Sequence, residues 1–152
     1  MGQRCAGYVA RMAEYERERA LPATAEDAFA VAADLDTLDR WLPHGVSVTH
    51  EGDRAVSAHV EAASREVDAR GLARARPEQL RLEWGSRDNP DYAGWLQVEH
   101  AGEGRSSAVL HLSFLGDQPE THGGSAAREV EAAMDEALDK LARVVEESAG
   151  QS

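Results

Sequence analysis

The chain has 152 residues, of which 42% are apolar, enough for one ordinary domain with a single hydrophobic core. Its formal net charge of −12 disfavours binding to nucleic acid or to an anionic membrane surface, because both would repel it. No stretch approaches the roughly 20 apolar residues of a membrane helix, so no membrane insertion is expected. The single cysteine, Cys5, excludes an internal disulfide framework and a cysteine-rich zinc site.

The first residues show no regular pattern. Met1–Arg11 lack the apolar core and the cleavage site of a secretory signal, and Met12 could be the true start. We predict a disordered tail over residues 1–13 and one folded domain over residues 14–149. Lys140 is the only lysine among sixteen basic residues, a bias typical of GC-rich bacterial genomes. These features favour a bacterial, cytoplasmic protein.

Residues 15–21 alternate in character and predict a strand that ends before Pro22. One side of this strand carries Tyr15, Arg17, Arg19 and Leu21. Thr24 then precedes Asp27 at the spacing of a capping box, where its hydroxyl can accept a free N–H at the start of a helix.

Two short helices are expected after this cap. The first carries an apolar stripe that includes Ala28 and Phe29. Asp34 or Asp36 caps the second, which carries Trp41 and is stopped by Pro43.

The next segment predicts six consecutive antiparallel strands. A hairpin at Gly52 would pair Val48 with Val56, Val46 with Ala58 and His50 with Arg54. A turn at Arg76-Pro77 would set Leu82 opposite Gly71 and Trp84 near Ala69. The loop from Gly102 to Gly104 would pair Val98 with Ala108, Leu96 with Leu110, Gly94 with Leu112 and Tyr92 with Phe114. This register places nearly all the apolar residues of the last two strands on one face, as a one-sided sheet requires.

A long helix is predicted from Ser125, its expected N-cap, to Ser148. Apolar residues recur along it at helical spacing, and five are expected to face the sheet: Val130, Met134, Leu138, Leu141 and Val145. The predicted fold is therefore α+β, in the order β-α-α-β6-α. A curved seven-stranded antiparallel sheet wraps the C-terminal helix and leaves a ligand cavity between them.

Two motifs are similar to those of the START-like superfamily (SRPBCC, helix-grip fold). Residues 21–29, Leu-Pro-Ala-Thr-Ala-Glu-Asp-Ala-Phe, resemble its apolar-x-Ala-Pro-x-Glu-x-apolar-aromatic motif. Asp34 followed by Trp41-Leu42-Pro43 resembles its Asp…Trp-x-Pro motif. The resemblance spans residues 15–147 and is strongest to the polyketide cyclase/dehydrase and lipid-transport members. It implies the helix-grip fold and says little about the ligand.

Two arginines share the inward parity of Leu21 and so are expected at the cavity. Arg17 and Arg19 could clamp a carboxylate, phosphate or enolate oxygen through their paired N–H donors. Alternatively, inward charges on an edge strand discourage sheet-to-sheet aggregation. Arg17 is the better candidate for the clamp because it lies deeper.

Four aromatic residues and two apolar residues of the last helix are the other candidates for lining the cavity. With the inferred register, the lining comprises Trp41, Trp84, Tyr92, Phe114, Met134 and Leu138. These side chains could stack a planar or polycyclic ligand, or simply fill the core. The Tyr92 hydroxyl could also orient a ligand or act as a weak acid.

The six histidines show no metal-ligand spacing, so neither a metal nor another cofactor is predicted. His59 and His111 have outward parity, and His111 falls opposite Trp95. His50 alone has inward parity, near the mouth, where it could act as an acid or base or be a solvated rim residue. Trp95 and Val109 form a small outward apolar patch, consistent with a monomer or a weak homodimer.

The leading functional hypothesis is binding of an apolar or aromatic small molecule, lipid-like or polyketide-like, in the cavity. The alternative is a polyketide aromatase/cyclase or dehydratase in which Arg17, Tyr92 or His50 moves protons or stabilises an enolate. A further alternative, implied by the resemblance, is a self-resistance protein that sequesters a toxic metabolite.

Overall fold

The computed structural model describes residues 12–43, 46–50, 55–62, 65–86, 92–115 and 124–150. Its elements follow the predicted order: β1 (Met12–Leu21), α2 (Ala25–Ala32), the 3-10 helix η1 (Leu35–Arg40), β2 (Val46–His50), β3 (Ala55–Ala62), β4 (Arg65–Arg76), the 3-10 turn η2 (Pro77–Gln79), β5 (Arg81–Ser86), β6 (Tyr92–His100), β7 (Ser106–Leu115) and α3 (Gly124–Gly150). The second short helix is thus a 3-10 helix. The tail before Met12, including Cys5, lies outside the described residues, and β1 already begins at Met12.

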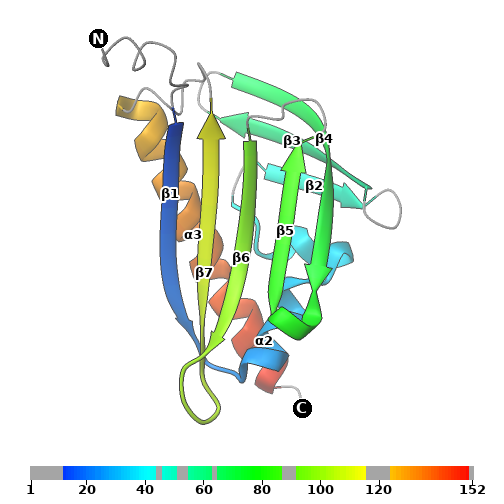
Figure 1. The fold of residues 1–152 in the computed structure, drawn as a ribbon, viewed down its shortest axis with the longest axis vertical. Helices are drawn as coiled ribbons and strands as arrows, with labels where there is room; N and C mark the ends of the chain where they lie inside the picture. The colour runs from blue at the N-terminus through cyan, green and yellow to red at the C-terminus, as the bar shows by residue number, and fades with distance from the viewer. Residues whose placement is uncertain are drawn as a thin grey trace, which may run out of the picture.

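The seven strands form one antiparallel sheet in the order β1-β7-β6-β5-β4-β3-β2. The strands from β2 to β7 lie side by side in the order of the chain. The first strand, β1, pairs with the last one, β7. The helix α3 runs behind β1, β7 and β6 in Figure 1, and its main strand contact is with β1. The predicted helix-grip arrangement is confirmed. None of the helices in the described segments has the length and apolar character of a membrane span.

The helix α2 begins where the sequence predicts. The hydroxyl of Thr24 accepts the backbone N–H of Asp27 at 3.2 Å and so satisfies one of the free donors of the first turn. The helix α3 begins at Gly124, one residue before the predicted cap, Ser125, and continues to Gly150. The predicted inward side of this helix is confirmed, because Met134, Leu138, Leu141 and Val145 are buried and Val130 packs partly buried against the core.

One predicted register is confirmed and two are wrong. Leu96 pairs with Leu110 and Tyr92 with Phe114, as predicted. The turn between these strands contains Gly102 (φ 118°) and Gly104 (φ 69°), backbone conformations that glycine adopts most easily.

The β2–β3 register is shifted by two residues from the prediction. Val48 faces Ala58 and His50 faces Val56, because the connection between the strands spans residues 51–54 instead of three residues about Gly52. Residues 51–54, and with them Arg54, lie outside the described part.

The β4–β5 register is shifted by four residues from the prediction. Leu82 faces Ala75 and Trp84 faces Ala73, because the chain turns at η2 and not at Arg76-Pro77. The turn ends at Leu80, whose left-handed backbone (φ 55°, ψ 45°) returns the chain directly into β5.

Charged side chains brace the β4–β5 hairpin. Glu83 accepts a bond from Arg81 Nε at 2.7 Å and another from Arg76 Nε at 3.0 Å. These bonds, first that of Arg81 and then that of Arg76, hold the pKa of the Glu83 carboxyl below its ordinary value of 4.5. The hairpin is therefore closed by charge-assisted bonds on its outer face.

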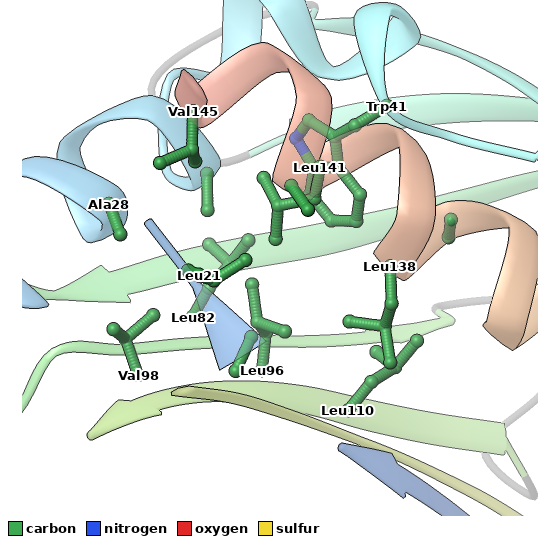
Figure 2. Packing of buried hydrophobic residues seen from close by; sticks show 14 of the residues in the cluster. Leu21, Ala28, Trp41, Leu82, Leu96, Val98, Leu110, Leu138, Leu141 and Val145 are labelled. Carbon is green, nitrogen blue, oxygen red and sulfur yellow. The ribbon is translucent and has the colours of Figure 1, made fainter. Parts of the chain in front are cut away.

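The close-packed core lies between the inner face of the sheet and the helices α2, η1 and α3. Figure 2 shows side chains from the sheet meeting side chains of α3, with Ala28 of α2 and Trp41 beside them. The largest fully buried side chains include Leu21, Leu96, Val98, Leu138, Leu141 and Val145. Partly exposed side chains occur on the inner face toward the end of β5, the start of β6 and the end of β7, which form the upper half of the sheet in Figure 1, so a ligand site is sought there.

Candidate functional site in the upper half of the sheet

Four aromatic side chains form a row across the inner face of β1, β7, β6 and β5. Tyr15 meets Phe114 edge to face, with ring centroids 5.8 Å apart and planes at 81°. Phe114 meets Tyr92 at 5.1 Å and 42°. The indole Nε1 of Trp84 donates to the Tyr92 hydroxyl at 3.1 Å. We call Tyr15, Phe114, Tyr92 and Trp84 the aromatic row.

The strand register assembles this row. Tyr92 and Phe114 are direct cross-strand partners, and Trp84 faces Gly94, which comes two residues after Tyr92 on β6. A Cβ atom at Gly94 would lie only 2.6 Å from Trp84 Nε1, so the indole ring rests directly on the glycine backbone. The indole thus lies between two small residues, because Trp84 faces Gly94 on one neighbouring strand and Ala73 on the other.

The row divides into a buried and an exposed part. Tyr15 and Phe114 are 9% and 8% exposed, whereas Trp84 and Tyr92 remain partly exposed. Other inner-face or helix residues packed against the core are partly exposed as well, namely Ala13, Leu112, Ala127 and Val130. Solvent therefore reaches apolar inner-face side chains in the upper half, in contrast to the fully buried leucines below.

In the hydrogen bond between Trp84 and Tyr92, the tyrosine hydroxyl is the acceptor. An indole N–H can only donate, so the Tyr92 oxygen is the acceptor and its own hydrogen is directed away from Trp84. A phenol held in this way can donate to a ligand oxygen or support proton transfer.

Both predicted arginines lie on the α3 side of β1, as their parity indicates, and both meet carboxylates of the helix. Arg17 lies 3.5 Å from Asp135 and 3.8 Å from Glu131, and Arg19 lies 3.1 Å from Asp139. We call this set of ion pairs the β1–α3 seam. Arg17 is the less exposed of the two, with 39% of its side chain accessible against 47% for Arg19. An anionic ligand would have to compete with these carboxylates for the guanidinium groups.

Three other predicted lining residues belong to the buried core. Met134 and Leu138 are each 2% exposed, and Trp41 is 3% exposed. Trp41 lies beside Leu141 in Figure 2, and its Nε1 has no hydrogen-bond partner in the described segments. The side chain of His50 lies outside the described residues, although its backbone forms the end of β2.

On the outer face, Trp95 is covered by other side chains. Its ring stacks on His111 at 4.9 Å and 5°, and the guanidinium of Arg81 lies 4.3 Å above it. His111 is also within 3.1 Å of both Glu14 and Glu16. The described residues contain no group of three or more His, Cys, Asp or Glu side chains placed to hold a metal ion.

Tyr15 is the member of the site that the sequence reasoning missed. Its parity with Leu21 indicated an inward side chain, but the sequence carried no sign that β1 pairs with β7. Only that pairing brings Tyr15 against Phe114. The available signal was that Tyr15 lies on the same side of its strand as Arg17 and Arg19, the residues already expected at the cavity.

Comparison with known proteins agrees with this architecture. The family described as polyketide cyclase / dehydrase and lipid transport matches residues 12–146. No curated protein gives a significant match.

Solved structures with the same fold include TTHA0849 from Thermus thermophilus, with a TM-score of 0.75, 24% identity, and 90% of this chain and 99% of that chain covered. The Zhui aromatase/cyclase from a Streptomyces species has a TM-score of 0.64 and 17% identity, with coverages of 89% and 94%. Norcoclaurine synthase from Thalictrum flavum, solved with dopamine and hydroxybenzaldehyde, has a TM-score of 0.69 and 11% identity, with coverages of 92% and 90%.

At these identities the likeness to solved structures shows the shared fold. The family match spans β1, both short helices, the remaining six strands and most of α3. The chain therefore belongs to the polyketide cyclase/dehydrase and lipid transport family.

Proposed function

We propose that the protein binds an apolar or aromatic small molecule, lipid-like or polyketide-like, between the aromatic row and α3. The observation that carries this proposal is the partial exposure of Trp84 and Tyr92 on the inner face of the sheet. Apolar side chains that face inward and still meet solvent gain free energy when a ligand covers them.

The expected affinity follows from the apolar area available. Each ligand methylene buried contributes about 0.8 kcal/mol, and contact with an aromatic ring adds roughly 0.5–1.5 kcal/mol. A ligand with about ten buried carbons would therefore reach about micromolar affinity. The charge of −12 would affect this little, since the row itself carries no charged group.

A matched pair of dyes and a matched pair of tryptophans test the proposal. The neutral dye N-phenylnaphthylamine should become fluorescent on binding. Trp84→Leu should weaken the affinity for this dye by about two- to tenfold, because one aromatic contact is lost. Trp95→Leu removes a tryptophan from the opposite face of the sheet and should leave the affinity unchanged. Equal effects of the two substitutions, or no dye binding by the folded wild type, would contradict the proposal.

The second candidate function is that of a polyketide aromatase/cyclase or dehydratase. The hydrogen bond from Trp84 to the Tyr92 oxygen favours it, because it orients a proton donor among apolar groups. Tyr92→Phe should then abolish conversion of a polyketide mimic while N-phenylnaphthylamine still binds. Full turnover by this variant would remove Tyr92 from the reaction and leave the binding function as the conclusion.

Arg17 is the residue that would contact an anionic group of the ligand, at the β1–α3 seam. Anilinonaphthalene sulfonate is the sulfonated counterpart of N-phenylnaphthylamine, so the two dyes differ mainly in charge. Arg17→Ala should weaken the sulfonate more than the neutral dye. If both dyes respond equally, the arginine serves the seam and not the ligand.

A further inference from the structure

A concave surface lies away from the aromatic row, where α2 meets the connection between β4 and β5. It is a groove of about 410 Å³ between α2 and the β4–β5 connection, which we call the α2–η2 groove. Its apolar lining includes Phe29 and Ala33 on one side and Ala75, Pro77 and Leu80 on the other. Figure 1 places α2 and the start of β5 at the lower end, whereas Trp84, Tyr92 and Phe114 belong to the parts of β5, β6 and β7 toward the upper end. None of its lining residues belongs to the row.

The wall formed by the β4–β5 connection is held in place by hydrogen bonds. The Leu80 N–H donates to the Pro77 oxygen at 3.1 Å, and the Leu80 oxygen accepts the Val98 N–H at 2.9 Å. The Gln97 amide donates to the Gln79 oxygen at 2.7 Å. A left-handed leucine that lines a groove is uncommon, and such backbone conformations concentrate at functional positions. The groove is thus preformed, which lowers the entropic cost of binding.

The polar part of the groove is acidic. Glu26 in the first turn of α2 and Asp34 just beyond its end both line the groove, and both are exposed. His100 Nε2 lies 3.4 Å from the Glu26 carboxylate. No lysine or arginine is among the described lining residues, and the whole chain carries a net charge of −12. An apolar surface with two carboxylates among its lining residues complements a molecule with an apolar body and a positive charge.

We propose that the α2–η2 groove binds a small organic amine in its protonated form. The apolar body lies between Phe29 and Leu80, and the ammonium group lies against the carboxylate of Glu26 or Asp34. This site is separate from the proposed ligand site of the aromatic row, so either can exist without the other.

Three probes that share a phenyl-alkyl body and differ in charge isolate the role of the carboxylates. Backbone amide shifts are followed by NMR while phenethylamine, phenethyl alcohol or phenylpropionate is added to the full chain. Phenethylamine should give saturable shifts centred on α2 and Leu80, the alcohol weaker ones, and the carboxylate none. Shifts spread over the whole acidic surface, or equal binding of amine and alcohol, would overturn the proposal.

Variants then assign the charge and the apolar wall. The double variant Glu26→Gln/Asp34→Asn should weaken phenethylamine by about two- to tenfold, because exposed ion pairs are individually weak. A control that removes two exposed carboxylates of α3, Glu129→Gln/Glu146→Gln, should leave its affinity unchanged. Ala75→Phe fills the groove from an exposed strand position and should abolish binding while the melting temperature stays close to that of the wild type. Unchanged amine affinity in the double variant, or in a folded Ala75→Phe protein, would refute the assignment.

Discussion

The contact between Gly94 and Trp84 predicts that a single added methyl group will disturb the aromatic row. In Gly94→Ala the new Cβ would lie 2.6 Å from Trp84 Nε1 and 2.7 Å from two further ring atoms, well inside ordinary contact distance. Gly94 is not among the described glycines with positive φ, so alanine fits the backbone and the whole penalty falls on the contact. The indole must therefore move off its place and lose its bond to Tyr92.

Two opposing effects set the size of the change. Adding a methyl group to a packed contact costs about 1–3 kcal/mol. Replacing glycine by alanine recovers about 0.4–1 kcal/mol by restricting the unfolded chain. The expected net loss lies between about 0 and 2.6 kcal/mol in the free energy of unfolding. Its central value of about 1.3 kcal/mol corresponds to a fall in melting temperature of about 3–5 °C for a domain of this size.

Thermal unfolding of the wild type and a small set of variants checks this reasoning. Gly85→Ala is the matched control, because the nearest atom to its new Cβ is the backbone carbonyl oxygen of Tyr92 at an ordinary 3.8 Å, and its melting temperature should not fall. In a Trp84→Ala background, Gly94→Ala should no longer destabilise, since the clashing ring is gone. An equal loss from Gly94→Ala with and without the Trp84 ring would refute the contact as its cause. So would equal melting temperatures for the Gly94 and Gly85 variants.

Three further predictions concern the core, the seam and the β4–β5 hairpin. Leu96→Ala empties a fully buried position and should cost about 2–5 kcal/mol in chemical denaturation, whereas Leu72→Ala, at a site 47% exposed, should change stability by less than about 0.5 kcal/mol. Arg17→Ala should lower stability by less than about 1 kcal/mol, and the loss should disappear in about 1 M salt, because the seam is exposed. A salt-independent loss would show a role beyond charge. The lowered pKa of Glu83 stabilises the fold above its ordinary value of 4.5, and this contribution is lost as the pH falls through the folded-state pKa. Glu83→Gln should therefore destabilise the protein at neutral pH and match the wild type in acid, and a pH-independent difference would contradict this.

Where the structure describes the side chains, the sequence was sufficient to predict the buried face of a strand even when the partner residues were wrong, as at Leu82. The predicted β2–β3 and β4–β5 registers were shifted by two and four residues. Side chains alternate with a period of two, so an even shift exchanges partners and preserves the face. Leu82 was therefore correctly assigned to the core although it faces Ala75 and not Gly71. Turn geometry, such as the left-handed Leu80, sets the partners, and it left no clear signal in the sequence.

The sequence could not predict which of the inward aromatic residues would be buried and which would stay partly exposed. Trp41 and Trp84 are both inward tryptophans, yet one is 3% exposed beneath η1 and α3 and the other is partly open to solvent. That difference depends on how α3 lies across the sheet, which parity does not encode. The same holds for the arginines, whose inward direction was predicted but whose carboxylate partners on α3 were not.

The position of β1 beside β7 has a consequence for the order of folding. Five of the six strand pairings join neighbours in the chain, so each closes a short loop. The β1–β7 pairing instead joins Tyr15 to Leu112, so it must wait until about three-quarters of the chain has been synthesised. Contacts of such long range form slowly, because the entropy of closing the chain is lost before the contact is gained. We expect β1 to dock last, together with α3, and its amides to gain protection from hydrogen exchange later than those of β6. Since β1 carries Tyr15 and Arg17, the upper site would be the last part of the molecule to become complete on the ribosome.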